Sequence, residues 1–198
     1  MRKSREAMAQ HHRNIVEGGA RLLRERGIEG LSVADLMQAA GLTHGGFYRH
    51  FASKDAFVCE ATDAAFAGVA AMRGAAAPDQ GPDAQLLAFL GYYLSQAHCD
   101  DPGMGCPIAA FGGEAARASA EIRERFAVGV EGVLDWISAR LGGTAEQRRS
   151  GAAEMLAVMV GAVVAARAVG AGDLADGLLG AARRHGAEIA RAGANLPH

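Results

Sequence analysis

Apolar residues in this chain recur at spacings of three and four, which is the period of a helix buried on one side. No stretch of strand length alternates Val, Ile or aromatic residues with polar ones. Short breaks rich in glycine, proline or aspartate separate segments of helical length. We therefore predict an all-α protein of about nine helices. The expected helices cover 11–26, 33–40, 44–50, a segment from 54, 83–98, 106–117, 119–141, 145–169 and 173–193.

The chain length of 198 residues is enough to bury a core without disulfides or structural metals. Its three cysteines are an odd number without C-x-x-C spacing, which fits a reducing cytoplasm. The longest unbroken apolar run, 155–166, is shorter than the roughly 20 residues that cross a bilayer. We expect a cytoplasmic protein with no membrane contact, and a buried helix at this run.

The two ends of the chain differ in charge. Residues 1–55 carry nine basic and six acidic side chains, although the whole chain has a net charge of −2. A basic segment attached to an acidic body is typical of a protein that meets an anionic partner with one end. We predict a head over 1–55 and a larger helical body over 56–198 for effector binding and dimerisation.

The head contains the pattern of a helix-turn-helix. Ser32 is placed to cap a short helix over 33–40, Gly41 supplies the turn, and Thr43 is placed to cap a second short helix. Phe47 and Phe51, four residues apart, share one face and are predicted to be buried. The exposed sides of the second helix then carry mostly polar residues and glycine.

The segment from Ala40-Gly41-Leu42-Thr43 to Phe47-Tyr48-Arg49-His50-Phe51-Ala52-Ser53-Lys54 resembles the DNA-binding head of the tetracycline-repressor (TetR) family of bacterial regulators. The resemblance covers about residues 10–60, and the body is similar only in the number and order of helices. It implies a homodimeric repressor that binds a double-stranded, palindromic DNA operator and releases it when a small effector binds the body.

Carried over to this chain, the resemblance implies base contacts by Thr43, His44 and Gly45. It implies phosphate contacts by Ser32, Tyr48, Arg49, His50 and Lys54. Hydroxyl and guanidinium groups suit phosphate, and such contacts fix position without reading sequence. Tyr48 packed at a helix junction and His50 as an interior histidine are the alternatives. Gly46, where many relatives carry a bulkier polar residue, leaves the operator sequence open.

The body is expected to supply both the dimer interface and the effector site. The resemblance implies dimerisation through the last two helices, where small residues permit close approach, and the alternative is that these faces pack only within the monomer. Aromatic and methionine side chains from separate helices are candidates to enclose an apolar or aromatic effector, and the alternative is an ordinary core. This candidate pocket consists of Phe89, Tyr92, Tyr93, Phe111, Trp136, Met155 and Met159.

Cys106 offers a different route to induction. It stands before Pro107 at the expected start of a helix, where a thiol pKa tends to fall, and Cys99 is a conceivable disulfide partner. Asp100 and Asp101 oppose a low pKa, and an inert buried cysteine is the alternative.

The sequence contains no metal-ligand spacing, phosphate loop or nucleophile motif. We therefore predict no enzyme, cofactor or metal. A carrier or enzyme that uses only the helical body is the alternative from another class.

Overall fold

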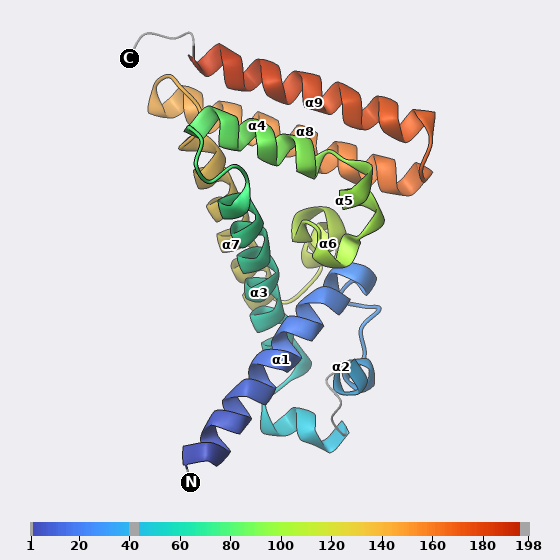
Figure 1. Ribbon diagram of the computed structural model, residues 1–198. Coiled ribbons are helices and arrows are strands. Elements are labelled where there is room, and N and C mark those ends of the chain that lie inside the picture. Colours follow the sequence, from blue (N-terminus) through green and yellow to red (C-terminus); the bar gives the residue numbers. More distant parts are fainter. Residues whose placement is uncertain (1, 40–43, 195–198) are drawn as a thin grey trace.

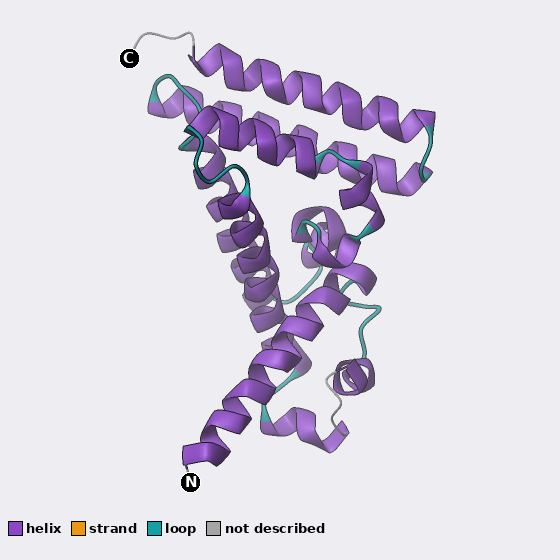
Figure 2. Cartoon of the chain, in the orientation of Figure 1, coloured by secondary structure: helices purple, strands orange, loops and turns teal. Residues whose placement is uncertain are grey.

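The computed structural model describes residues 2–39 and 44–194 (Figure 1). Over these residues the chain forms nine α-helices and two short 3-10 helices, with no strand (Figure 2). The prediction of an all-α protein is therefore confirmed.

The head begins with α1 (Arg2–Arg26), followed by α2 (Val33–Ala39) and the 3-10 helix η1 (His44–Arg49). Helix α1 starts well before the predicted residue 11, because residues 2–10 include good helix formers and neither glycine nor proline. It ends at Arg26. The next residue, Gly27, has a φ of +75°, which is the left-handed conformation expected of a glycine that stops a helix. Segment 44–49 is a 3-10 helix rather than the predicted α-helix, and its two consecutive glycines favour this short, weaker form.

The body contains α3 to α9 and a second 3-10 helix. Their bounds are α3 (Lys54–Ala75), α4 (Pro82–Tyr93), α5 (Gln96–Asp100), η2 (Pro102–Met104), α6 (Pro107–Ala115), α7 (Ala120–Ser138), α8 (Ala145–Val169) and α9 (Asp173–Ala194).

The helix predicted over 83–98 is divided into α4 and α5. Leu94 leaves the helical conformation, and the Ser95 hydroxyl accepts a hydrogen bond of 3.2 Å from the backbone N–H of His98. The same hydroxyl donates to the carbonyl of Tyr92 at 2.6 Å. A serine that offers the backbone these local partners ends one helix and begins the next.

Two hydrophobic cores follow one another along the molecule. The head core joins α1, α2, η1 and the first half of α3, and it also includes Phe111 and Ile122 from the body. The body core begins at Phe66 in the second half of α3. Helices α3 and α7 run side by side from the head to the opposite end, where α8 and α9 pack against each other (Figure 1).

Helix α8 has the length and apolar composition of a membrane span, a test that a core helix of a soluble protein also passes. Only 33% of the most apolar 18-residue stretch of α8 is buried within the chain. Much of this apolar helix therefore faces outward from the subunit.

Candidate functional site

Three phenylalanine rings fix the position of η1. Phe47 and Phe51 are buried as predicted, at 0% and 3% exposure, and both rings pack with Phe57 of α3. The centroids of Phe47 and Phe51 lie 5.2 Å apart. With these rings in the core, Tyr48 and Arg49 lie on the outer side of η1, and Tyr48 is 63% exposed.

Ser32 caps α2 as predicted, and Ser53 caps α3 at the junction of head and body. The backbone N–H of Asp35 donates to the Ser32 hydroxyl at 3.1 Å, and the N–H of Ser32 donates back to the Asp35 carboxylate at 3.0 Å. Hydrogen bonds from Ser32 and the nearby charge of Arg26 lower the pKa of Asp35. Ser53 caps α3 by accepting from the N–H of Ala56 at 3.0 Å.

Lys54 has a structural partner inside the head. Its ammonium donates a hydrogen bond of 2.8 Å to the carbonyl of Ile28, in the turn after α1. This contact ties the start of α3 to the end of α1. A lysine ammonium has three donors, so the contact leaves donors for a second partner.

A shallow groove of about 460 Å³ lies between α1 and η1. His12 stacks on Phe51 at 4.8 Å, and its Nε2 lies 2.6 Å from the carboxylate of Glu60. His50 lies 5.8 Å from His12, and burial and the neighbouring His12 lower its pKa. The groove residues are Met8, Ala9, His12, Arg13, Arg49 and His50. Ala9 and Arg13 are four residues apart, which places both on one face of α1. This spacing is the sequence signal that α1 contributes to the groove.

The structure describes two of the three predicted base-contact residues. Thr43 lies outside the described residues, together with the turn at Gly41. His44 and Gly45 are the first two residues of η1.

The predicted effector residues do not form one group. Phe89, Tyr93 and Trp136 lie together, with Phe89 at 5.7 Å from Tyr93 and 5.2 Å from Trp136. Met155 and Met159 are buried in the same body core. Phe111 instead belongs to the head core, where its ring packs edge-on against Phe126 at 5.5 Å.

An apolar pocket of about 350 Å³ opens between the end of α3 and α4. Tyr92, 43% exposed, and the buried Phe89 are the predicted residues that line it. Four further lining residues were not predicted from the sequence. These are Met72, Ala75, Ala76 and Ala88.

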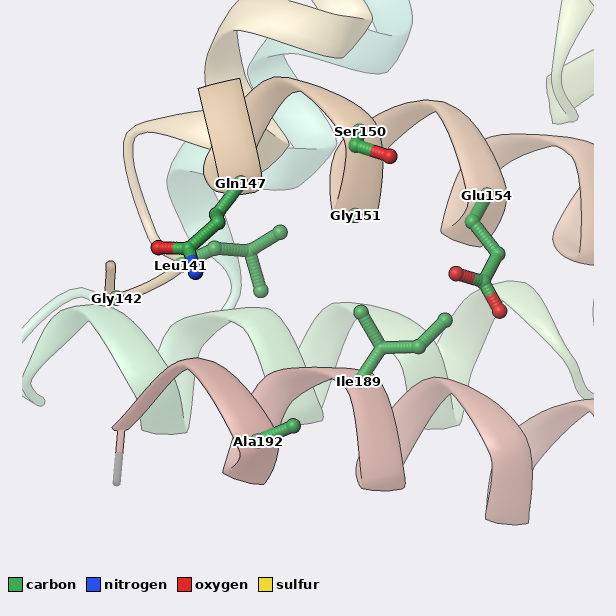
Figure 3. Close-up of a pocket in the computed structure, with 8 residues that line it drawn as sticks. All are labelled: Leu141, Gly142, Gln147, Ser150, Gly151, Glu154, Ile189 and Ala192. Atoms are coloured by element: carbon green, nitrogen blue, oxygen red, sulfur yellow. The ribbon is translucent and has the colours of Figure 1, made fainter. Parts of the chain in front are cut away.

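A second pocket, of about 310 Å³, lies between α8, α9 and the end of α7. Figure 3 shows Leu141 and Ile189 extending into it from opposite sides, with Gln147 and Glu154 along α8. Glu154 is paired with His185 of α9 at 2.8 Å, and this contact raises the pKa of His185. None of the predicted effector residues lines this pocket.

Cys106 is buried, at 2% exposure, directly before α6. Its backbone N–H donates to Nε2 of His98 at 3.1 Å, so Nδ1 of His98 carries the proton and donates to the carbonyl of Tyr93 at 2.6 Å. Burial lowers the pKa of His98 and raises the pKa of the Cys99 thiol. The two backbone contacts hold the His98 imidazole in one neutral tautomer.

In the described residues of the head, α2 packs against both α1 and η1, an arrangement compatible with a helix-turn-helix. Residues 15–61 match the family described as bacterial regulatory proteins of the tetR family. A crystal structure of a TetR transcriptional regulator from Chloroflexus aurantiacus is similar, with a TM-score of 0.76 and 26% identity over 95% of this chain and 96% of that one. Residues 15–61 are thus similar to the DNA-binding segment of TetR-family regulators, and the described fold is similar to that of a TetR-family structure over most of the chain.

Curated relatives are similar over shorter stretches. An uncharacterised HTH-type transcriptional regulator, from two strains of Mycobacterium tuberculosis, is 36% identical over 114 residues, which are 57% of this chain and 56% of the relative. The repressor DhaR of Mycobacterium sp. strain GP1 is 43% identical over 54 residues, which are 27% of this chain and 26% of that protein. The chain thus matches about half the length of its first curated relative. Each of these relatives is described as a transcriptional regulator or repressor.

Proposed function

We propose that this chain is a cytoplasmic, homodimeric repressor that binds a palindromic DNA operator through its head. The observation that carries this proposal is the anchoring of η1. Its two phenylalanines are locked into the core against Phe57, while Tyr48 and Arg49 lie on the outer side. A short, rigid element that presents polar and basic groups outward is suited to a DNA groove. The family similarity at residues 15–61 supports the same conclusion.

Within this proposal, Thr43, His44 and Gly45 contact base edges. The phosphate-binding residues are Ser32, Tyr48, Arg49, His50 and Lys54. Arg49 and His50 line the groove between α1 and η1, which adds His12 and Arg13 as neighbouring basic groups. Lys54 would reach a phosphate with the donors that Ile28 leaves available.

The exposed apolar face of α8 and α9 supports dimerisation through these helices. Val164 and Val169 of α8 are 47% and 48% exposed, and Leu174 at the start of α9 is 64% exposed. A Cβ atom placed on Gly161 or Gly177 would meet no atom of the same chain within 4 Å. Small and apolar residues that are open in one subunit are what a close helix-helix interface requires.

The proposed effector enters the body at the pocket between α3 and α4. Its walls are mostly apolar, and Phe89 connects it to the body core. A pocket of this size accommodates a small organic molecule. The segment from α5 to α6 lies between the body core and α1, so a rearrangement there would move the head.

Induction through Cys106 is the second candidate. The burial of Cys106 opposes direct attack by an oxidant, so this route requires the α5–α6 segment to open. Diamide should then release DNA from the wild type and not from Cys106→Ser.

A footprinting experiment on the DNA upstream of the gene for this chain tests the proposal. The expected result is a protected palindrome. Substituting Thr43 or His44 should change the preferred sequence, whereas Tyr48→Ala should weaken binding to all sequences. Absence of any protected palindrome in this region would contradict autoregulation, and failure to select a sequence from random duplexes would contradict operator binding altogether.

A further inference from the structure

Arg73 of α3 is a buried cation without an acidic partner. Its exposure is 6%, and no carboxylate among the described residues lies within ion-pair distance of it. Nη1 donates a long hydrogen bond of 3.3 Å to the carbonyl of Gly132, and Nε has no partner. Burial lowers the pKa of this guanidinium. Because an unpaired buried charge is costly, its presence in the core calls for a compensating group.

Tyr93 of α4 is a second buried donor without an acceptor. The side chain is 3% exposed, and its hydroxyl has no hydrogen-bond partner in the described structure. Burial and the adjacent Cys106 raise the pKa of Tyr93. The Phe89 ring packs against Tyr93 at 5.7 Å and against Trp136 at 5.2 Å, and Arg73 lies 5.5 Å from the Trp136 ring, so both donors belong to the same part of the body core. An anion would satisfy both.

The neighbouring charges add to the positive character of this region. Arg140 lies over the Trp136 ring at 3.8 Å and binds the neutral amide of Gln85, while Arg73 lies 5.5 Å from the same ring. Glu131 and Asp135 of α7 are close in sequence to Gly132 and Trp136, which contact Arg73. They do not neutralise Arg73 or Arg140, because both pair with Arg149 of α8.

Two aromatic rings, those of Phe89 and Trp136, lie between the apolar pocket and Arg73. Phe89 forms part of the pocket wall and packs edge-on against Trp136 at 5.2 Å. The guanidinium of Arg73 in turn lies over the Trp136 ring. Phe89 is therefore the residue shared by the pocket wall and the core that holds the two donors, and a ligand that reaches both regions requires its ring to move.

We propose that the body binds a small organic anion with an apolar tail, of the alkyl or aryl carboxylate class. The tail occupies the pocket beside Phe89, and the carboxylate reaches the guanidinium of Arg73 and the hydroxyl of Tyr93. This inference deepens the proposed function, on which it rests for the role of the ligand as effector. The Arg73 contact is the charge-assisted hydrogen bond that gives the site its preference for an acid over an alcohol.

Binding of octanoate, with 1-octanol as its uncharged match, tests the site. Trp136 is the one tryptophan in the sequence, so its fluorescence reports directly on this region. We expect octanoate to change the Trp136 emission and to bind at least about tenfold more tightly than 1-octanol, because one charge-assisted contact has about this effect. Arg73→Met should abolish the preference. The control Arg149→Met, which changes an exposed arginine on α8, should keep it.

Tyr93→Phe provides an independent variant that preserves the shape of the core. It should weaken octanoate binding by several-fold and leave 1-octanol binding unchanged. Equal binding of the two compounds, an unchanged preference in both variants, or no response of Trp136 to octanoate would overturn the inference. Binding of ligand-free protein to DNA is measured in parallel. DNA binding without octanoate binding refutes this inference alone, and octanoate binding without DNA binding refutes only the proposed regulatory function.

Discussion

The guanidinium of Arg24 in α1 donates a hydrogen bond of 2.6 Å from Nε to the carbonyl of Gly103 in η2. Arg24 is buried at this contact, which joins the head to the body across 79 residues of sequence. On the body side, η2 is followed by Cys106, whose N–H is held by His98. Arg167 of α8 binds the carbonyl groups of His98 and Cys99. These contacts form a continuous connection from α8 to the head.

We expect Arg24→Met to destabilise the fold by about 1–3 kcal/mol, because the buried Gly103 carbonyl loses its partner. Urea unfolding of the variant measures this loss. Arg21→Met is the matched control on the same helix, since Arg21 is half exposed and its contacts with Glu25 and Asp101 lie at the surface. The control should change stability by less than about 0.5 kcal/mol. Equal effects of the two substitutions would contradict a special role for Arg24.

Gly18 and Gly19 of α1 should respond oppositely to alanine. A Cβ at Gly19 would collide with the ring of Phe57, so Gly19→Ala should destabilise by about 1–3 kcal/mol. A Cβ at Gly18 meets no atom within 4 Å, and Gly18→Ala should stabilise by about 0.5–1 kcal/mol through helix propensity. Chemical denaturation of both variants checks the pair. If Gly19→Ala also stabilises, the close packing of α1 on α3 is wrong.

Arg49→Ala should reduce the salt dependence of DNA affinity. Because each chain of the dimer loses one phosphate contact, the slope of log K against log salt should become shallower by about 2, with little change in sequence preference. Arg123→Ala is the control, because Arg123 is exposed on α7 in the body. Fluorescence anisotropy over a salt series gives both slopes. A slope that Arg49→Ala leaves unchanged would remove Arg49 from the DNA contacts.

His98 should make the protein less stable in mild acid. Burial lowers its pKa in the folded state below the ordinary value of about 6.5, so the unfolded chain binds the additional proton as the pH falls. The stabilisation is therefore present above pH 6.5 and is lost as the pH falls through the folded-state pKa. His185 acts in the opposite sense, because its pKa is raised by Glu154.

Urea midpoints of the wild type and His98→Gln between about pH 7.5 and 5.5 test this dependence. The wild type should lose up to about 1.4 kcal/mol per pH unit from this one group, and the variant should lose less. His185→Gln serves as the second comparison, and it should steepen the loss. Identical pH profiles for the wild type and His98→Gln would show that His98 is not held neutral.

The features of the head that were predictable depend on short sequence spacings. The burial of Phe47 and Phe51 follows from four residues of separation, and the caps at Ser32 and Ser53 follow from their positions before apolar helices. Contacts between distant segments gave no such signal. The Lys54 ammonium meets Ile28 across 26 residues, and only the folded chain brings them together.

At the effector site, even more depends on contacts between distant segments that the sequence did not indicate. The sequence indicates that Phe89, Phe111 and Trp136 are apolar, yet only helix packing decides that Phe111 joins the head core while the other two meet in the body. Arg73 was passed over, although a single arginine within the apolar second half of α3 was a visible signal. Arg73 stands out as a candidate ligand contact because no carboxylate of the described residues pairs with it, which only the tertiary structure shows.

The salt dependence of binding to duplex DNA tests the central claim most directly. A dimer that touches roughly eight phosphates should lose on the order of ten-thousandfold in affinity between about 50 and 200 mM salt, with two chains bound per operator. Affinity that stays constant over this range, or the absence of a two-chain complex, would contradict the account and favour a carrier or enzyme that uses the helical body alone.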